Sequence, residues 1–317
     1  MTAFLSDIID ALGYGVTYFP LVLGVFLSFR LQRFPDLTVN GSFSLGAVVT
    51  AKMLMWGADP VTATFAGFLA GAGAGMITGA LITGLHIEKA LAGILVTIAL
   101  YSVNVMILGS VEYPFGDLHT LLESMHAGAE QVFGSGSTAS FLGIEVFIRP
   151  LFWLLVFGMF AVALLLGIRW FFRTRLGLAM RSAGENPSAA RVVGANVSAM
   201  VILTLMLSNA LAALSGTLWA QNWGTVSLED GTSAIVIGLA GVLIGDAFFG
   251  KRRFSVRLVG VLAGTLLHEL IQKAIVTLFG NVQQGLKLIT TAVVILAIVL
   301  PRLKTRLWSP AKVEEKK

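Results

Sequence analysis

Residues Arg173–Val197 read RTRLGLAMRSAGENPSAARVVGANV, and this basic stretch lies between two hydrophobic blocks. Gly184 can end a first helical piece at about 176–183, and Asn186-Pro187 can start a second piece near 188–193. A passive connector would be shorter and more polar, so we expect this helix–turn–helix to face the cytoplasm and to be held there by another protein. The alternative is an interfacial helix that rests on anionic lipid.

Composition indicates the class of the whole chain. Of its 317 residues, 56% are hydrophobic and 12% are charged, and the mean hydropathy is +0.86. Soluble domains carry about 25% charged residues, so the sequence predicts an all-α polytopic membrane protein. Its 35 glycines favour close helix packing, above all Gly67, Gly71, Gly75 and Gly79, which follow one another at intervals of four.

The same composition argues against several kinds of site. The chain has no cysteine, which rules out a disulfide frame and a thiol nucleophile. No two of the four histidines share the spacing of a metal-binding pair on one helix, so we expect no metal site. No Ser/His/Asp arrangement is placed for acyl transfer, and we expect no cofactor. The formal net charge of +5 comes from residues at the ends of spans, so it does not indicate nucleic-acid binding.

Nine hydrophobic segments are each close to the roughly 20 residues that a helix needs to cross a bilayer. They cover 13–31, 38–56, 60–84, 91–109, 150–172, 198–222, 233–250, 255–279 and 284–301. A partial span within 110–148 would change the count to eight or ten. We therefore expect a single transmembrane domain over 1–305, followed by a charged cytoplasmic tail at 306–317.

The connections between these segments sort by charge. One set is rich in Lys and Arg and includes Arg30, Arg33, Lys89, Arg173–Arg191, Lys251–Arg253 and Arg302–Arg306. The other set is nearly free of these residues, with Arg149 as the main exception. By the positive-inside rule the basic set is cytoplasmic, which places the N-terminus outside the cell and the C-terminal tail inside.

Polar residues within the spans are candidates for a solute path. Small and polar residues open the second span, and irregular backbone at membrane depth survives only against protein or a watery cavity. The candidates are Asn40, Ser42, Ser44, Asn104 and Asn209. The alternative is that these side chains only form hydrogen bonds between neighbouring helices.

The eighth span contains charged residues that are costly inside a bilayer. It includes His268, Glu269, Gln272 and Lys273, and a free Glu or Lys at mid-membrane costs roughly 2.5–3.5 kcal/mol. This face must therefore contact protein or water, or lie near the outer surface. Glu269 and Lys273 are four residues apart with the acid first, so we expect a structural ion pair, with a transport role as the alternative.

Two parts of the chain resemble each other and predict an inverted repeat. Both 67–71 and 260–264 read G-x-L-A-G, and Asn40-Gly41-Ser42 matches Asp230-Gly231-Thr232 at nearly the same offset. The copies lie five spans apart, so they should cross the membrane in opposite directions, and such repeats place a pathway between the halves. The halves are about 13–109 and 198–301, linked by the span 150–172 and the cytoplasmic segment 173–197.

Three stretches resemble a known family. They are FPDLTVNGSFSLG at Phe34–Gly46, ALAGILVTIALY at Ala90–Tyr101 and RLGLAMRSAGENPSAARVVGAN at Arg175–Asn196. Together they resemble the permease subunits of bacterial ABC importers related to branched-chain amino-acid permeases. More narrowly, they look like the permeases paired with binding proteins for tryptophan- or tyrosine-like ligands. The resemblance covers most of residues 10–305.

The resemblance implies an inner-membrane transport subunit that is not an enzyme and that imports a small solute, an amino acid in the first place. In this family the matching Gly-Glu-Asn region forms a coupling helix that fits a groove on a cytoplasmic ATP-binding-cassette ATPase. Carried over, the ATPase-coupling residues are Arg181, Gly184, Glu185 and Asn186. The other implied partners are a second permease subunit and an extracytoplasmic solute-binding protein, docked near 110–148 and 223–232.

Two other functions stay open from the residues alone. An ion-gradient-driven secondary transporter would also have inverted repeats and intramembrane polar residues, with Glu269 as its proton carrier. It would not need a cytoplasmic helix–turn–helix of this length. A membrane scaffold without transport is the third class, and the repeat and the broken second span argue against it.

Overall fold

The computed structural model describes residues 2–116, 118–125, 128, 138–141, 144–249, 253–279 and the single positions 288, 291, 292 and 295. Most of these residues are helical. The long helices are α1 (Thr2–Leu31), α2 (Thr38–Met55), α3 (Pro60–Thr83), α4 (Lys89–Leu108), α6 (Ile148–Phe171), α9 (Val197–Trp223), α10 (Ala234–Phe249) and α11 (Phe254–Phe279). Two shorter helices, α7 (Arg175–Glu185) and α8 (Pro187–Val192), lie between α6 and α9.

Eight of the nine predicted spans correspond to these long helices. Within the described residues, seven helices are long and apolar enough to cross a membrane. The helix outside that set is α2, whose first turns are polar and whose side chains are mostly buried by neighbouring helices. The ninth predicted span, 284–301, lies almost entirely outside the described residues, so the predicted count is supported only roughly.

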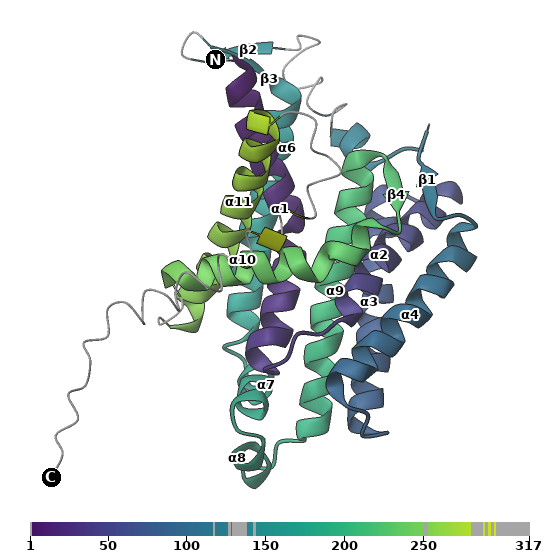
Figure 1. Ribbon diagram of the computed structural model, residues 1–317, viewed down its shortest axis with the longest axis vertical. Helices are drawn as coiled ribbons and strands as arrows, with labels where there is room; N and C mark the ends of the chain where they lie inside the picture. The colour runs from purple at the N-terminus through teal and green to yellow at the C-terminus, as the bar shows by residue number, and fades with distance from the viewer. Residues whose placement is uncertain are drawn as a thin grey trace, which may run out of the picture.

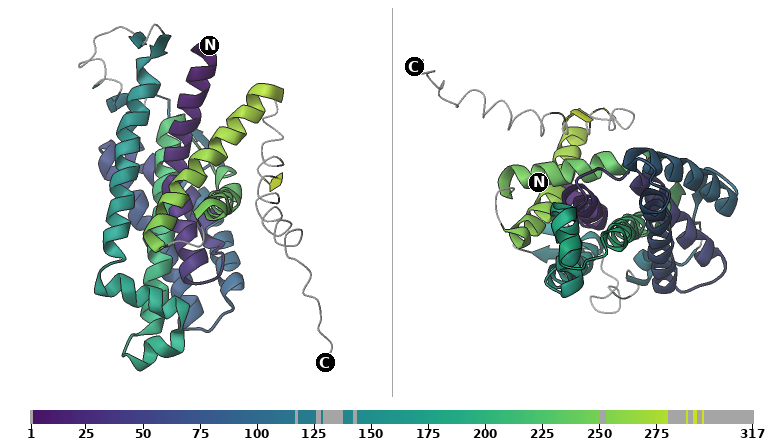
Figure 2. Two further views of the ribbon diagram at one scale, coloured as in Figure 1. Left: turned by 90° about the vertical axis from the view of Figure 1, so that its left-hand side faces the viewer. Right: turned by 90° about the horizontal axis from the view of Figure 1, so that it is seen from below.

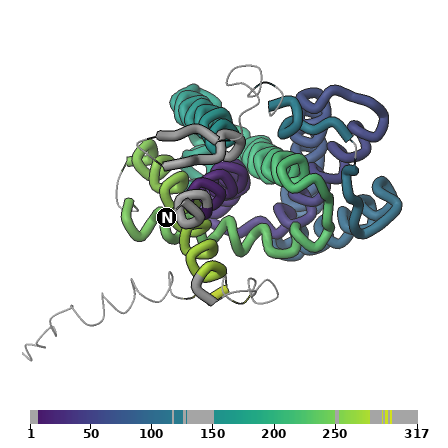
Figure 3. The backbone as a smooth tube through the Cα atoms, turned by 90° about the horizontal axis from the view of Figure 1, so that it is seen from above, coloured from purple at the N-terminus to yellow at the C-terminus, as the bar shows by residue number. Residues whose placement is uncertain are grey.

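The long helices run together between two ends of the molecule, and α10 crosses them. Figure 1 shows the N-terminus at one end and α7 and α8 at the other. In the same view α10 lies across α1 and α9, and the side view shows it almost end-on (Figure 2). From above, α10 passes along one side of the bundle, from α11 past α1 toward α2 (Figure 3). The prediction of a span at 233–250 did not anticipate this crosswise direction.

Glycines let the central helix α9 approach three neighbours closely. Gly24 of α1, Gly46 of α2 and Gly75 of α3 each lie against a backbone carbonyl of α9, where a Cβ atom would overlap that oxygen. Most α9 side chains from Ser208 to Gln221 are buried as a result. The predicted role of the glycine series in α3 is therefore confirmed for Gly75.

Replacement of Gly75 by valine is expected to remove most of the folded protein, because the side chain would overlap the Leu205 carbonyl and the main chain of Met206. Overpacking typically costs about 1–3 kcal/mol, and occasionally more. Gly73→Val is the matched control, since nothing lies within 4 Å of a Cβ at that position of the same helix. The yield of folded protein in detergent and the temperature of thermal unfolding would be measured for both variants. Equal stability of the two would contradict this packing.

Short strands lie at the end of the bundle opposite α7 and α8 (Figure 1). Strand β1 (Glu112–Pro114) pairs antiparallel with β4 (Thr225–Ser227), which joins the segment after α4 to the segment after α9. Strand β2 (Thr138–Phe141) pairs with β3 (Ile144–Phe147) just before α6. A short 3₁₀ helix, η1 (Asp230–Ser233), leads from β4 into α10.

The charged residues of α11 do not pair as the sequence predicted. Lys273 Nζ lies 3.0 Å from Asp7 and 3.8 Å from Asp10, both on α1. Glu269 instead contacts His268, with 2.9 Å between Oε1 and Nδ1. The predicted Glu269–Lys273 ion pair is therefore wrong, because the neighbouring helix offers Lys273 two carboxylates that local spacing could not show.

Candidate coupling element and solute path

The helix pair α7–α8 is defined by its capping residues. Thr174 Oγ1 accepts a hydrogen bond from Gly177 N at 3.3 Å and begins α7. Asn186 ends α7 and begins α8, where its Oδ1 accepts from Ala189 N at 3.1 Å and Pro187 takes the first helical position. The predicted restart at Asn186-Pro187 is confirmed.

Gly184 does not end α7, as the sequence suggested, but lies inside its last turn. A Cβ atom at this position would overlap the carbonyl oxygen of Leu31, the last residue of α1. Asn186 terminates the helix in an extended conformation instead. Glycine is therefore required here for close approach of two helices and not for a left-handed turn.

Arg181 and Glu185 lie one turn apart on α7 and differ in exposure. The Arg181 guanidinium is 4.6 Å from the ring centroid of Phe254, the first residue of α11. Its Nη2 is 3.9 Å from Glu185 Oε1, and the two side chains are 31% and 65% exposed. Arg181 therefore holds α7 against the bundle, whereas Glu185 and the exposed Asn186 face away from it.

Apolar side chains are strongly exposed on the same outer side. Val192 is 88% exposed and Val193 is 79% exposed, at the end of α8. These valines were not among the predicted coupling residues, although two β-branched residues directly after Arg191 were a visible signal. Exposed apolar residues rimmed by charge are typical of protein-interaction surfaces.

Ser42 and Asn209, two predicted path residues, touch in the buried centre of the bundle. Ser42 Oγ donates to Asn209 Oδ1 at 2.7 Å, and Asn209 Nδ2 donates to Asp36 Oδ2 at 2.7 Å. Asp36 Oδ1 also accepts from Thr38 N at 3.0 Å, so this carboxylate caps α2. All four side chains are buried. Capping by Asp36 is a local property, but its contact with Asn209, 173 residues away, is not.

Asn40 joins the first turn of α2 to the start of α10. Its Oδ1 accepts a hydrogen bond from Ile235 N at 2.8 Å, and its Nδ2 donates to Thr232 O at 3.3 Å. Asn40 therefore caps the N-terminus of another helix across the bundle.

Ser44 binds the same connecting segment, since its Oγ donates to Leu228 O at 3.3 Å. Gly231 in η1 lies directly against Ser44 Oγ and the Asn40 carbonyl, with no room for a Cβ atom. The two motifs matched by the predicted repeat, 40–42 and 230–232, are thus in contact. The repeat itself stays a prediction, because the last helix of its second copy lies almost entirely outside the described residues.

Asn104 completes this set from α4. Its Nδ2 donates to Gly41 O at 3.4 Å, and the residue is 1% exposed. The five predicted path residues therefore all meet at the first two turns of α2, where they join it to α4, α9 and η1. These hydrogen bonds are packing contacts between elements of one chain.

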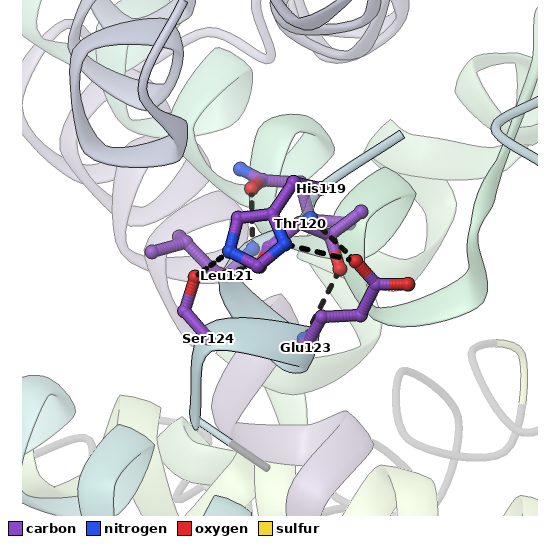
Figure 4. A network of polar contacts seen from close by, with 6 residues as sticks. His119, Thr120, Leu121, Glu123 and Ser124 are labelled. Carbon is purple, nitrogen blue, oxygen red and sulfur yellow. Dashed lines mark hydrogen bonds and ion pairs between the residues drawn. The ribbon is translucent and has the colours of Figure 1, made fainter. Parts of the chain in front are cut away.

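The external segment 118–125 is held against α9. Thr120 and Glu123 form a capping box, in which Glu123 N donates to Thr120 Oγ1 at 3.3 Å and Thr120 N donates to Glu123 Oε2 at 3.4 Å (Figure 4). Leu121 N donates to Gln221 Oε1 of α9 at 3.0 Å. This part of the predicted external connection is therefore built into the outer surface.

The sequence as a whole matches a family of transport proteins. The family described as the permease component of branched-chain amino acid transport systems matches residues 8–299. The chain belongs to this family. The permease is thus the membrane-spanning subunit of an ATP-binding-cassette importer, as its resemblance implied, and a multi-pass protein of the bacterial inner membrane. Membership of the family implies an ATPase and a substrate-binding protein as partners.

Relatives of the permease include transporters for different solutes. It is 31% identical to the tyrosine transport system permease protein of Clostridioides difficile (strain R20291), over 92% of this chain and 90% of that one. It is 27% identical to the D-allose transport system permease protein AlsC of Escherichia coli (strain K12), over 94% and 81%. A solved inward-facing putative metal-chelate type ABC transporter is 15% identical with a TM-score of 0.47, over 96% and 84%.

Proposed function

We propose that α7–α8 docks on a cytoplasmic ATP-binding-cassette ATPase and that Glu185 and Asn186 contact that subunit. The observation that carries the proposal is the two-sided character of the helix pair. Its outer side exposes Val192 and Val193 beside charged residues, as expected of a surface that a partner covers. A helix pair that only rested on lipid would not need so specific a fit on its other side.

The inner side of the pair is fixed to the bundle by the other two coupling residues. Gly184 lies against Leu31 of α1, and Arg181 stacks on Phe254 of α11. A partner that displaces α7 would therefore displace the adjoining ends of both helices. In this proposal Arg181 and Gly184 transmit movement, whereas Glu185 and Asn186 make the contact.

The proposed path for the solute lies beside the start of α2, between this permease and a second permease subunit. Asn40 is 15 residues before the end of α2, roughly 22 Å along the helix axis. The connection that reaches it, which runs from β4 through the short 3₁₀ helix η1, exposes Glu229 and Thr232. Backbone of this kind at membrane depth must face protein or water, and it excludes lipid from this side.

An amino acid with an aromatic or branched side chain is the proposed solute, delivered by an extracytoplasmic binding protein at 118–125 and the β1–β4 pair. The tyrosine permease relative supports the amino acid, and the D-allose relative makes a sugar the alternative. Uptake of labelled tyrosine and allose into cells that express the complete importer would distinguish them. Uptake of allose alone would overturn the amino-acid assignment.

Glu185→Arg is expected to remove most of the ATPase that co-purifies with the permease, because a reversed charge at the contact costs binding free energy. The matched control is Glu112→Arg, which makes the same exchange at an exposed residue of β1 at the opposite end. The test measures ATPase bound per permease after purification from membranes. The docking proposal fails if no ATPase accompanies the intact permease, or if both variants retain it equally.

A further inference from the structure

The crosswise helix α10 is packed tightly on two sides. Gly238 lies against Val25 of α1, and Gly245 lies against the carbonyl of Gly260 in α11, with no room for a Cβ atom at either glycine. The helix has 16 residues and is roughly 24 Å long. Helix α10 therefore forms a stiff connection from the C-terminal part of α1 and the N-terminal part of α11 to the start of α2.

Near one end of α10, a single carboxylate holds two arginines from different helices. Asp246 is ion-paired with Arg30 of α1, and the Nε atom of Arg257 on α11 lies 3.4 Å from Asp246 Oδ1. The Asp246 side chain is only 13% exposed, so water and salt screen these pairs weakly. Without the carboxylate, both guanidinium groups would lose the acidic partner that they share.

The helix α7 contacts the neighbours of both arginines. Gly184 lies against Leu31, the residue after Arg30, and Arg181 stacks on Phe254, three residues before Arg257. A displacement of α7 would therefore act on Arg30 and Arg257 together. Asp246 is the group through which both arginines act on α10.

The opposite end of α10 is attached to the candidate solute path. Ile235 N donates to Asn40 Oδ1, and Asn40 Nδ2 donates to Thr232 O, just before the helix begins. Through these two hydrogen bonds a movement of α10 reaches the first turn of α2. Ser42, two residues further on, belongs to the buried cluster with Asn209.

We propose that Asp246 is a positioning residue for transport, which passes the displacement of α7 to α10 and through α10 to Asn40. This inference rests on the proposed docking of α7–α8 on the ATPase. Asp246 touches neither solute nor nucleotide, so its loss separates ATP hydrolysis from solute movement. A merely structural role would lower the amount of folded complex and would leave the solute imported per ATP unchanged.

The test uses the permease assembled with its ATPase and binding protein in liposomes that contain ATP, with hydrolysis and solute uptake measured on the same vesicles. Asp246→Asn is expected to keep the ATPase bound and to lower the solute imported per ATP about tenfold, within the 5–150-fold typical of coupling between sites. Asp246→Glu is expected to retain most of the wild-type ratio of solute imported to ATP hydrolysed. The control is Asp59→Asn, which neutralises the exposed N-cap of α3 and should leave the solute imported per ATP unchanged.

If the Asp246→Asn permease does not assemble with its ATPase and binding protein, a second variant provides the test. Arg30→Gln removes only the ion pair between α1 and α10 and leaves Asp246 paired with Arg257, and the same loss of coupling is expected. An assembled complex of either variant that imports as much solute per ATP as the wild type overturns the inference. If the ATPase does not bind even the wild-type permease, the proposed docking itself fails. If the ATPase binds and the variants import normally, only the role of Asp246 fails, so the two failures are distinguishable.

Discussion

Replacement of Gly184 by alanine is expected to abolish most ATP-driven import while the permease still inserts into the membrane. The added methyl group would overlap the carbonyl oxygen of Leu31, so α7 must move away from the end of α1. That movement breaks the contact through which the ATPase is proposed to act. We expect solute uptake to fall at least about tenfold, the scale of a typical coupling free energy between sites.

Uptake into vesicles and the amount of permease per vesicle would be measured together for Gly184→Ala. Gly167→Ala makes the same exchange near the end of α6, where nothing lies within 4 Å of a Cβ atom, and it should import normally. Normal import by Gly184→Ala would show that the approach of α7 to α1 is not needed for coupling. Equal loss in both variants would point to a general intolerance of alanine at these glycines.

Asn209→Asp is expected to have the largest effect on stability of any exchange in the buried cluster. The Asn209 amide donates to Asp36 across 2.7 Å, and the exchange would place two carboxylates at that distance with no exposure to water. Two like charges so close cannot both stay ionised. Loss of the hydrogen-bond donor to a buried polar group costs about 1–3 kcal/mol, and more when that group is charged, which is a large part of the stability of a typical domain.

The double variant Asn209→Asp with Asp36→Asn is the matched control, because it restores one amide donor facing one carboxylate. Folded yield and thermal unfolding in detergent would be compared for the single and double variants. We expect the double variant to recover most of what the single variant loses. The interpretation is wrong if the single variant unfolds at the wild-type temperature, or if the exchange of both residues brings no recovery.

Features that depend on a few neighbouring residues were predictable from the sequence. Hydrophobic length located eight helices, and the restart at Asn186-Pro187 followed from capping chemistry alone. The polar residues of α2 could also be singled out as a group, because a polar start to an apolar helix is a local anomaly; their role in a solute path stays a prediction. Which of these residues contacts α4, α9 or η1 depends on how the helices pack, and a short stretch of sequence carries no information about that packing.

Contacts between distant residues account for the predictions that failed. Gly184 was interpreted as a helix end because glycine commonly ends helices, but the decisive contact comes from Leu31, more than 150 residues earlier. Lys273 was assigned to Glu269 on its own helix, whereas α1 supplies Asp7 and Asp10. In each case a partner from another helix replaced the one that spacing favoured. The exposed Val192 and Val193 were missed for a different reason. In a chain that is mostly hydrophobic, two apolar residues do not differ from their surroundings in the sequence.

The central position of α9 has a consequence for the biosynthesis of this permease. Val197 comes after almost two thirds of the chain, so a ribosome makes α1 to α6 before the helix against which α1, α2 and α3 pack. Until then Gly46 and Gly75 have no α9 backbone to contact. The early helices therefore enter the bilayer before the helix that joins them has been made. Completion of α9 is the step at which α1, α2 and α3 can first pack against their common neighbour.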